Sequence, residues 1–168
     1  MRLFVLVLIL SGCVLAQLSP APPTPACGPD NINFSVQLDS SQHTLAEPEP
    51  GKARVYFLHE AGTSITVWYP TVKVAMDGAW VGANHGNSYF SVSVDPGEHH
   101  ICVTLQSSLV APRMELAHFA AAAGGVYFYR TRLVVSRSVE LLQLEPIDSD
   151  QGQYLADYFS LATAKTKK

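Results

Sequence analysis

The chain has 168 residues, of which 48% are apolar, 10% aromatic and only 15% charged. This length corresponds to one domain, and the apolar content excludes a disordered acidic or basic chain. Lysine and arginine total 11 against 14 aspartates and glutamates, a net charge of −3, which excludes a large basic surface for nucleic acid. The 11 glycines and 11 prolines have no period, so they exclude collagen and a long coiled coil and indicate short elements joined by turns.

Residues 1–16 have the pattern of an export signal. Arg2 precedes the apolar run Leu3–Leu10, which is too short to span a bilayer core of about 30 Å. Two cleavage sites compete: LSGC, ending at Cys13, resembles a bacterial lipobox, whereas VLA, ending at Ala16, fits ordinary signal peptidase. We expect Cys13 to become a lipidated N-terminus that anchors the chain to a membrane, with cleavage after Ala16 as the alternative.

The cysteine content is consistent with export. The chain has three cysteines, and removal or lipidation of Cys13 leaves Cys27 and Cys102. Two cysteines in an oxidising compartment can pair, so we expect a disulfide between them. The sequence contains no C-x-x-C spacing, so it supports neither a thioredoxin-like redox site nor a zinc knuckle.

Residues 17–50 are expected to form a proline-rich tether with one short strand. Prolines recur between residues 20 and 29, where they favour an extended polyproline II chain. Behind a lipid at Cys13, this tether would hold the folded part off the membrane at about 3.1 Å per residue. Apolar and polar residues alternate along Asn31–Leu38, which predicts the strand.

Residues 51–147 repeat short β-rich runs separated by turns, which predicts a β-sandwich domain. Asp77 and Gly78 supply the positive φ angles of a tight hairpin turn between two such runs. Cys102 falls on the more polar face of its run, where a cysteine from the N-terminal segment can reach it. Met114–Ala123 is ambiguous, because its alanines favour a helix and its place among strands favours a strand. The expected strands are at 53–59, 65–69, 72–76, 79–81, 89–95, 98–105, 126–135 and 139–144.

Residues 148–168 are expected to form a short helix, capped near Asp148 and packed on the sheet, and a solvated basic tail. Regular turns between about seven strands predict an all-β fold, an antiparallel β-sandwich of prealbumin-like or Ig-like type with this helix at its end. The expected core residues are Val55, Phe57, Val74, Phe90, Val92, Ile101, Val103, Tyr127 and Leu133.

Several of these motifs, in this order, resemble a known family. They are PGKARVYF at 50–57, VAMDGAWVG at 74–82, SYF at 88–90, VDPGEH at 94–99 and AGGVYF at 123–128. Together they resemble the bacterial family called domain of unknown function 2846, over roughly residues 50 to 147. The resemblance implies a small exported protein, often a lipoprotein, with a β-sandwich-like core. It implies no activity and no catalytic residues.

The sequence offers no catalytic, cofactor or metal motif. It contains neither a G-x-S-x-G elbow nor a phosphate loop, and Glu47 and Glu49 lie in a proline-rich hinge that is unsuited to paired-carboxylate catalysis. His99 and His100 are neighbours on a predicted strand and point to opposite faces, so they cannot chelate one ion together. We therefore expect no catalytic residue, no cofactor and no metal, and a protein that is not an enzyme.

Charged and aromatic side chains suggest two further surfaces. Arg130 and Arg132 share one face of a strand, where they could hold an anionic group or pair with Glu140 across a hairpin. An exposed strand edge, or this pairing with Glu140, is the simpler interpretation. An aromatic group could contact a sugar or peptide, with core packing as the favoured alternative; its members are Trp68, Tyr69 and Trp80.

One loop is a candidate ligand site. Asn84, His85 and Asn87 lie in a polar, glycine-containing loop after the hairpin, and loops of this kind can carry binding residues. A solvated turn is the alternative. The sequence thus predicts an exported, lipid-anchored protein of the bacterial cell envelope, a non-enzymatic binding or structural module. It does not identify an envelope protein or glycan as the partner. The alternative is a soluble secreted or periplasmic ligand-binding protein without the anchor.

Overall fold

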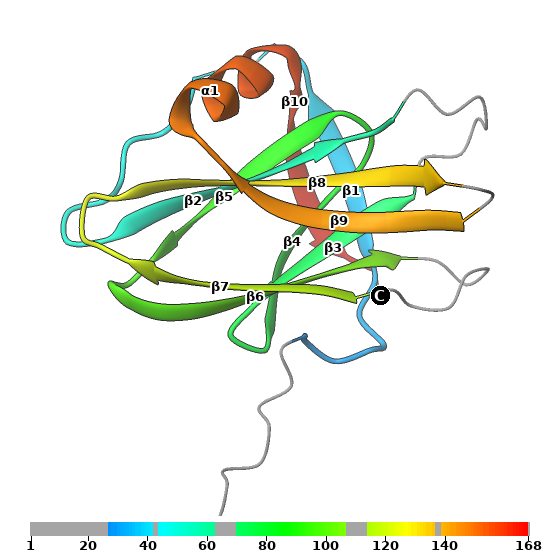
Figure 1. The fold of residues 1–168 in the computed structure, drawn as a ribbon, viewed down its shortest axis with the longest axis horizontal. Coiled ribbons are helices and arrows are strands. Elements are labelled where there is room, and N and C mark those ends of the chain that lie inside the picture. The colour runs from blue at the N-terminus through cyan, green and yellow to red at the C-terminus, as the bar shows by residue number, and fades with distance from the viewer. Residues whose placement is uncertain (1–26, 42–43, 63–69, 107–113, 137–138, 168) are drawn as a thin grey trace, which may run out of the picture.

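The structure is a computed structural model that describes residues 27–41, 44–62, 70–106, 114–136 and 139–167. Two β-sheets pack face to face, and one helix, α1 (Ser149–Tyr158), lies on the outside (Figure 1). The predicted all-β sandwich with a short helix near the C-terminus is confirmed. The strands are β1 (Phe34–Asp39), β2 (Ala53–Glu60), β3 (Thr71–Met76), β4 (Ala79–Asn84), β5 (Ser88–Val94), β6 (Gly97–Gln106), β7 (Met114–Ala121), β8 (Val126–Ser136), β9 (Val139–Ile147) and β10 (Ser160–Thr166).

The larger sheet has six strands in the order β1-β10-β5-β2-β8-β9, and the smaller has four in the order β4-β3-β6-β7. The larger sheet is mixed rather than purely antiparallel, because β2 pairs with β8, and β10 with β5, in parallel. Between β2 and β8 the chain crosses to the smaller sheet twice and returns in between as β5, which is antiparallel to β2. After the second crossing β8 again runs in the direction of β2. Strand number also exceeds the sequence prediction, because Met114–Ala121 is a strand and β10 follows the helix.

The main core lies between the two sheets. Strands β2 and β5 contribute Val55, Phe57 and Phe90, and strands β3 and β6 contribute Val74, Ile101 and Val103 from the other side. All six were expected in the core, and the other three expected residues, Val92, Tyr127 and Leu133, are partly buried against it. Alternation along most strands therefore identified the buried face correctly.

The structure answers two local questions: whether Asp77 and Gly78 form a hairpin turn, and whether Met114–Ala121 is a helix or a strand. The hairpin between β3 and β4 is confirmed, with φ values of 51° at Asp77 and 81° at Gly78. Met114–Ala121 pairs with β6 over its whole length, and its residues Ala117 and Phe119 pack against the core. Burial and sheet hydrogen bonds thus outweigh the helix propensity of alanine in this segment.

Helix α1 covers the outer face of the larger sheet. Asp148 caps it by accepting a hydrogen bond from the Gln151 N–H at 2.8 Å, as the sequence predicts. Gly152 lies so close to Phe128 that a Cβ atom there would stand 2.3 Å from the ring. A second apolar cluster forms beneath the helix, and its buried members are Tyr56, Leu58, Tyr89, Phe128, Ala156 and Phe159.

The sandwich extends beyond residues 51–147, the range that the sequence assigned to it. Strand β1, expected as an isolated strand in the tether, pairs with β10, and β10 contains Lys165 of the expected solvated tail. In β10, Ala162 is buried in the main core. The sequence did not predict β10 for two reasons. The end of the chain is basic, and the few small apolar residues of the strand give a weak pattern in isolation.

Several sequence predictions lie outside the described residues. These are the leader with the lipidation site Cys13, the tether before Cys27, and the strand at 65–69 with Trp68 and Tyr69. Within the described ranges, no helix is both long and apolar enough to cross a bilayer. The leader and the anchor therefore stay as predictions.

The contact between Gly152 and Phe128 predicts that Gly152→Ala destabilises the protein. Alanine improves helix propensity by up to about 1 kcal/mol, but displacing the helix or the ring costs about 1–3 kcal/mol, so the free energy of unfolding falls. Urea unfolding measures the change. The exposed Gln153→Ala variant in the same helix serves as control and should be neutral or stabilising. A Gly152→Ala protein as stable as the wild type would contradict the described helix packing.

Candidate functional site

Residues Cys27–Asn33, which we call the N-terminal strap, lie across the outer face of the smaller sheet. Pro29 accepts a hydrogen bond from Trp80 Nε1 at 2.8 Å, and Gly28 packs directly against the same indole ring. The next residue after the strap is held as well, because the Gln106 side-chain amide bonds both the N–H and the C=O of Phe34. Polar side chains of the sheet thus replace the missing strand-to-strand hydrogen bonds of the strap.

A disulfide between Cys27 and Cys102 fixes the start of the strap. The two Cα atoms are 5.2 Å apart, and Cys102 is fully buried on the outer face of β6. The predicted pair is therefore present in the structure. Its placement follows from the alternation in β6, which directs Ile101 and Val103 into the core and Cys102 toward the strap.

A pocket of about 370 Å³ lies between the strap and the smaller sheet. Its volume falls within the range of about 300–1,000 Å³ that is typical of small-molecule sites. Part of its wall is the strap itself, so the pocket depends on the strap being in place. The lining residues are Cys27, Asp30, Asn33, Lys73, Trp80, Thr104, Leu105, Gln106 and Met114.

Lys73 is the positively charged residue in the lining of this pocket. Although its side chain comes from β3 on the outer face of the sheet, the residue is only 6% exposed. Its ammonium donates to Ile32 O at 2.9 Å and lies 4.3 Å from the centroid of the Trp80 ring, a cation–π contact. Burial lowers the pKa of Lys73, and the carboxylate of Asp30 partly offsets this effect.

The pocket offers polar groups that can bind a ligand. The Lys73 ammonium has three N–H groups, so those not bonded to Ile32 can meet a carboxylate or carbonyl group. The buried Thr104 hydroxyl has no hydrogen-bond partner, which leaves a polar group at the pocket wall unsatisfied. The described lining contains no histidine and one carboxylate, Asp30. The sequence did not indicate this site, because the strap, β3 and β6 meet only in the fold. Of the lining residues, the sequence singled out Cys27 for a disulfide and Trp80 for an aromatic group.

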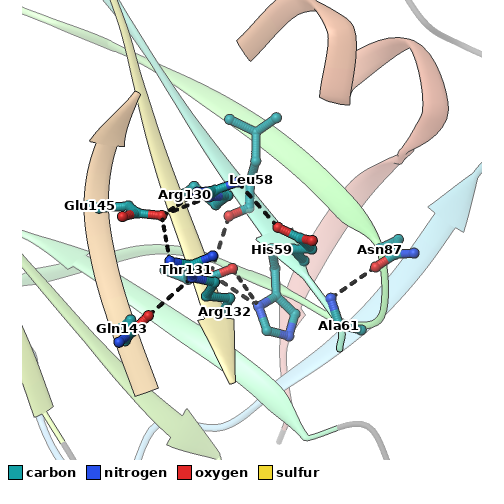
Figure 2. A network of polar contacts seen from close by, with 10 residues as sticks. Leu58, His59, Ala61, Asn87, Arg130, Thr131, Arg132, Gln143 and Glu145 are labelled. Atoms are coloured by element: carbon teal, nitrogen blue, oxygen red, sulfur yellow. Dashed lines mark hydrogen bonds and ion pairs between the residues drawn. The ribbon is translucent and has the colours of Figure 1, made fainter. Parts of the chain in front are cut away.

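A second polar cluster is sealed inside the sandwich. His59 on β2 and Thr131 on β8 are fully buried, and His59 Nδ1 lies 3.1 Å from Thr131 Oγ1 and 3.2 Å from Thr131 O (Figure 2). Because Thr131 Oγ1 donates to Leu58 O, it accepts from His59, so the ring proton is on Nδ1. His59 Nε2 is left buried without a partner. Burial, with a smaller effect from nearby His85, lowers the pKa of His59 to about 4, although the hydrogen bond to Thr131 partly offsets the shift.

The two arginines of β8 are neutralised on the outer face of the larger sheet. Arg130 binds Glu145 on β9 through two of its nitrogens and lies 3.3 Å from Glu60 on β2 (Figure 2). Arg132 donates to Gln143 at 3.0 Å and lies 3.5 Å from Glu145. The predicted pairing of these arginines with Glu140 is wrong, because the register of β8 and β9 places Glu145 opposite Arg130.

The loop predicted to hold a ligand is bonded within the fold. Asn84 is fully buried, donating to Phe57 O at 3.1 Å and accepting from Ser88 Oγ at 3.2 Å. The side chain of Asn87 accepts from the Ala61 N–H at 2.8 Å, as Figure 2 shows. His85 Nδ1 lies 3.5 Å from Thr71 Oγ1. These groups hold the loop against β2 and β3, and a ligand role for Asn84, His85 and Asn87 stays a prediction.

His99 ties the hairpin turn to β6. Its two ring nitrogens lie 2.7 Å from Asp77 Oδ2 and 2.7 Å from Asp95 O, so both ring protons have acceptors. Burial lowers the pKa of His99, but the hydrogen bonds to Asp95 and Asp77 outweigh it and leave the pKa raised. Among the residues that the structure describes, no three metal-ligating side chains gather at one point.

The disulfide predicts a large stability difference. Because the bond closes a loop with a sequence separation of 75, the double variant Cys27→Ala/Cys102→Ala should lose about 4 kcal/mol of unfolding free energy. Urea unfolding without reductant gives the value. Trp80→Phe is the matched control, since it removes the hydrogen bond to Pro29 with the disulfide intact and should cost about 1 kcal/mol. Equal unfolding free energies of the double variant and the wild type would contradict a stabilising effect of the disulfide.

His59 predicts that stability falls with acidification. Its pKa of about 4 in the folded state lies below the ordinary 6.5, so the unfolded chain binds more protons between these values. The contribution of neutral His59 to the free energy of unfolding is complete above pH 6.5. It is lost as the pH falls toward 4, by about 3 kcal/mol in total. The difference in unfolding free energy between wild type and His59→Gln, measured at pH 7 and pH 4, should shift by this amount. A difference that is independent of pH would refute the assignment.

Comparisons with known proteins leave the chain without an assigned family. No family model, curated protein or solved structure matches it. The resemblance to domain of unknown function 2846 is therefore a prediction from the motifs, and the fold and the strap pocket rest on the structure of this chain.

Proposed function

We propose that the chain is an exported, lipid-anchored protein of the bacterial cell envelope that acts without catalysis, as a binding or structural module. The observation that carries this proposal is the Cys27–Cys102 disulfide. Disulfides persist in oxidising compartments outside the cytoplasm, so this bond supports the export signal read in residues 1–16. Cys13, the expected lipid attachment site, precedes the strap by a proline-rich stretch.

The strap pocket supports a binding role. Its volume of about 370 Å³ suits a small ligand, and Lys73, Trp80 and Gln106 offer an ammonium, an aromatic face and an amide. If the anchor is present, the pocket lies at the end of the folded part that the tether joins, because Cys27 is one of its lining residues. The ligand class that this lining favours is a small molecule with a carboxylate or carbonyl group.

The second candidate is a soluble secreted or periplasmic ligand-binding protein without an anchor. The pocket favours it equally, because ligand binding there needs the disulfide but no lipid. The fate of Cys13 distinguishes the two candidates. In the first it is the modified N-terminal residue, and in the second it is removed with the leader.

Intact mass of the mature protein from a membrane fraction tests the proposal, beside a Cys13→Ser variant. A diacyl or triacyl mass that the variant lacks would support the anchor. A gain of two hydrogens on reduction would support the disulfide in the mature chain. An unlipidated chain that begins at Gln17 would refute the anchor and favour the soluble protein, whereas a chain that retains the leader in the cytoplasm would refute both.

A further inference from the structure

His100 on β6 and His118 on β7 lie directly opposite each other on the outer face of the smaller sheet. In an antiparallel pair, opposite Cβ atoms are about 4.5–5.5 Å apart, so their side chains lie side by side. The two imidazole rings have centroids 6.5 Å apart and planes inclined by 33°. Both residues are exposed, so solvent and ions reach the rings.

Neither ring has another bonding partner in the part of the chain that the structure describes. This sets them apart from His59, which bonds Thr131 inside the core, and from His99, whose ring nitrogens meet Asp77 and Asp95. The neutral imidazole lone pairs of His100 and His118 are therefore available. Glu98 is exposed one row along the same face of β6, and its carboxylate makes the local potential favourable for a cation.

We propose that His100 and His118 form a two-imidazole site for a divalent transition-metal ion. Imidazole nitrogen suits Zn²⁺, Cu²⁺ and Ni²⁺, with Zn–N distances of about 2.0–2.1 Å. Rotations of the two exposed side chains bring one nitrogen of each ring to a shared ion, because the backbone register already holds the two rings side by side. Water molecules complete the coordination.

A bound ion would join the edge strand β7 of the smaller sheet to its interior neighbour β6. Strand β7 is an edge strand of the smaller sheet and pairs with β6, and Figure 1 shows the two strands running together in this layer. Since the unfolded chain does not hold His100 and His118 together, the ion binds the folded state in preference and stabilises it. Metal binding and thermal stability are thus two separate readouts of the same site.

Isothermal titration calorimetry with Zn²⁺ and with Ni²⁺ tests the site in the mature, disulfide-bonded chain without a polyhistidine tag. The wild type should bind one ion, and His100→Ala and His118→Ala should each weaken binding by about tenfold or more, because the chelate is lost. His85→Ala is the control, since it removes a histidine from another part of the molecule and should bind like the wild type. A second control, His118→Ala/Met114→His, keeps the number of histidines but moves one to the exposed position opposite Thr104, and should bind as weakly as His118→Ala.

A zinc-dependent rise of the melting temperature, seen in the wild type and absent in both single variants, would support the site. Each variant must show its own cooperative melt, which separates loss of the ligand from loss of the fold. Ring resonances of His100 and His118 should shift together on zinc addition. Absence of binding by the wild type, or unchanged binding after either substitution of the pair, would overturn the proposal. Loss of binding in His85→Ala would also overturn it, because the ion would then lie elsewhere.

Discussion

Burial of both faces of β2 is the constraint on which the arrangement of the molecule depends. One face, with Val55 and Phe57, meets the smaller sheet, and the other, with Tyr56 and Leu58, lies beneath α1. Because water cannot reach the backbone of a strand that is covered on both faces, its N–H and C=O groups need hydrogen-bonded strands on both edges. Strands β5 and β8 supply these hydrogen bonds. The two apolar clusters therefore share one strand, and the positions of the helix, the second sheet and the buried His59 all follow from its placement.

The sequence predicts what local chemistry determines and misses what register determines. The Asp77-Gly78 turn, the alternation around Ile101 and the cap at Asp148 depend on neighbours in the chain, and the structure confirms each. Arg130 meets Glu145 because of a register between strands that no local pattern specifies. The sequence did not reveal the strap pocket for the same reason. The export signal and the two cysteines left after Cys13 indicated the disulfide, but no local pattern indicated that Lys73 would be buried beneath the strap.

The buried polar side chains fall into two groups with different structural roles. His59, Asn84 and Thr131 lie at the same end of the sandwich and are buried, where their hydrogen bonds join β2, β4, β8 and the loop after β4. Lys73 is nearly as buried, yet it faces a pocket that opens toward solvent and is closed on one side by a segment from outside the sheets. The first group therefore specifies how the strands fit together, whereas Lys73 gives the outer face of the smaller sheet a chemical character.

The position of Cys102 determines how the fold carries a mechanical load. Force applied to the N-terminal end of the chain enters through the disulfide into β6, an interior strand held by β3 on one edge and β7 on the other. Without that bond, the pull would pass through the strap to β1, an edge strand paired with β10 alone, and could peel it from the sheet. The disulfide thus places the load on a strand that is hydrogen-bonded along both edges, so the pairings with β3 and β7 must both break before β6 leaves the sheet.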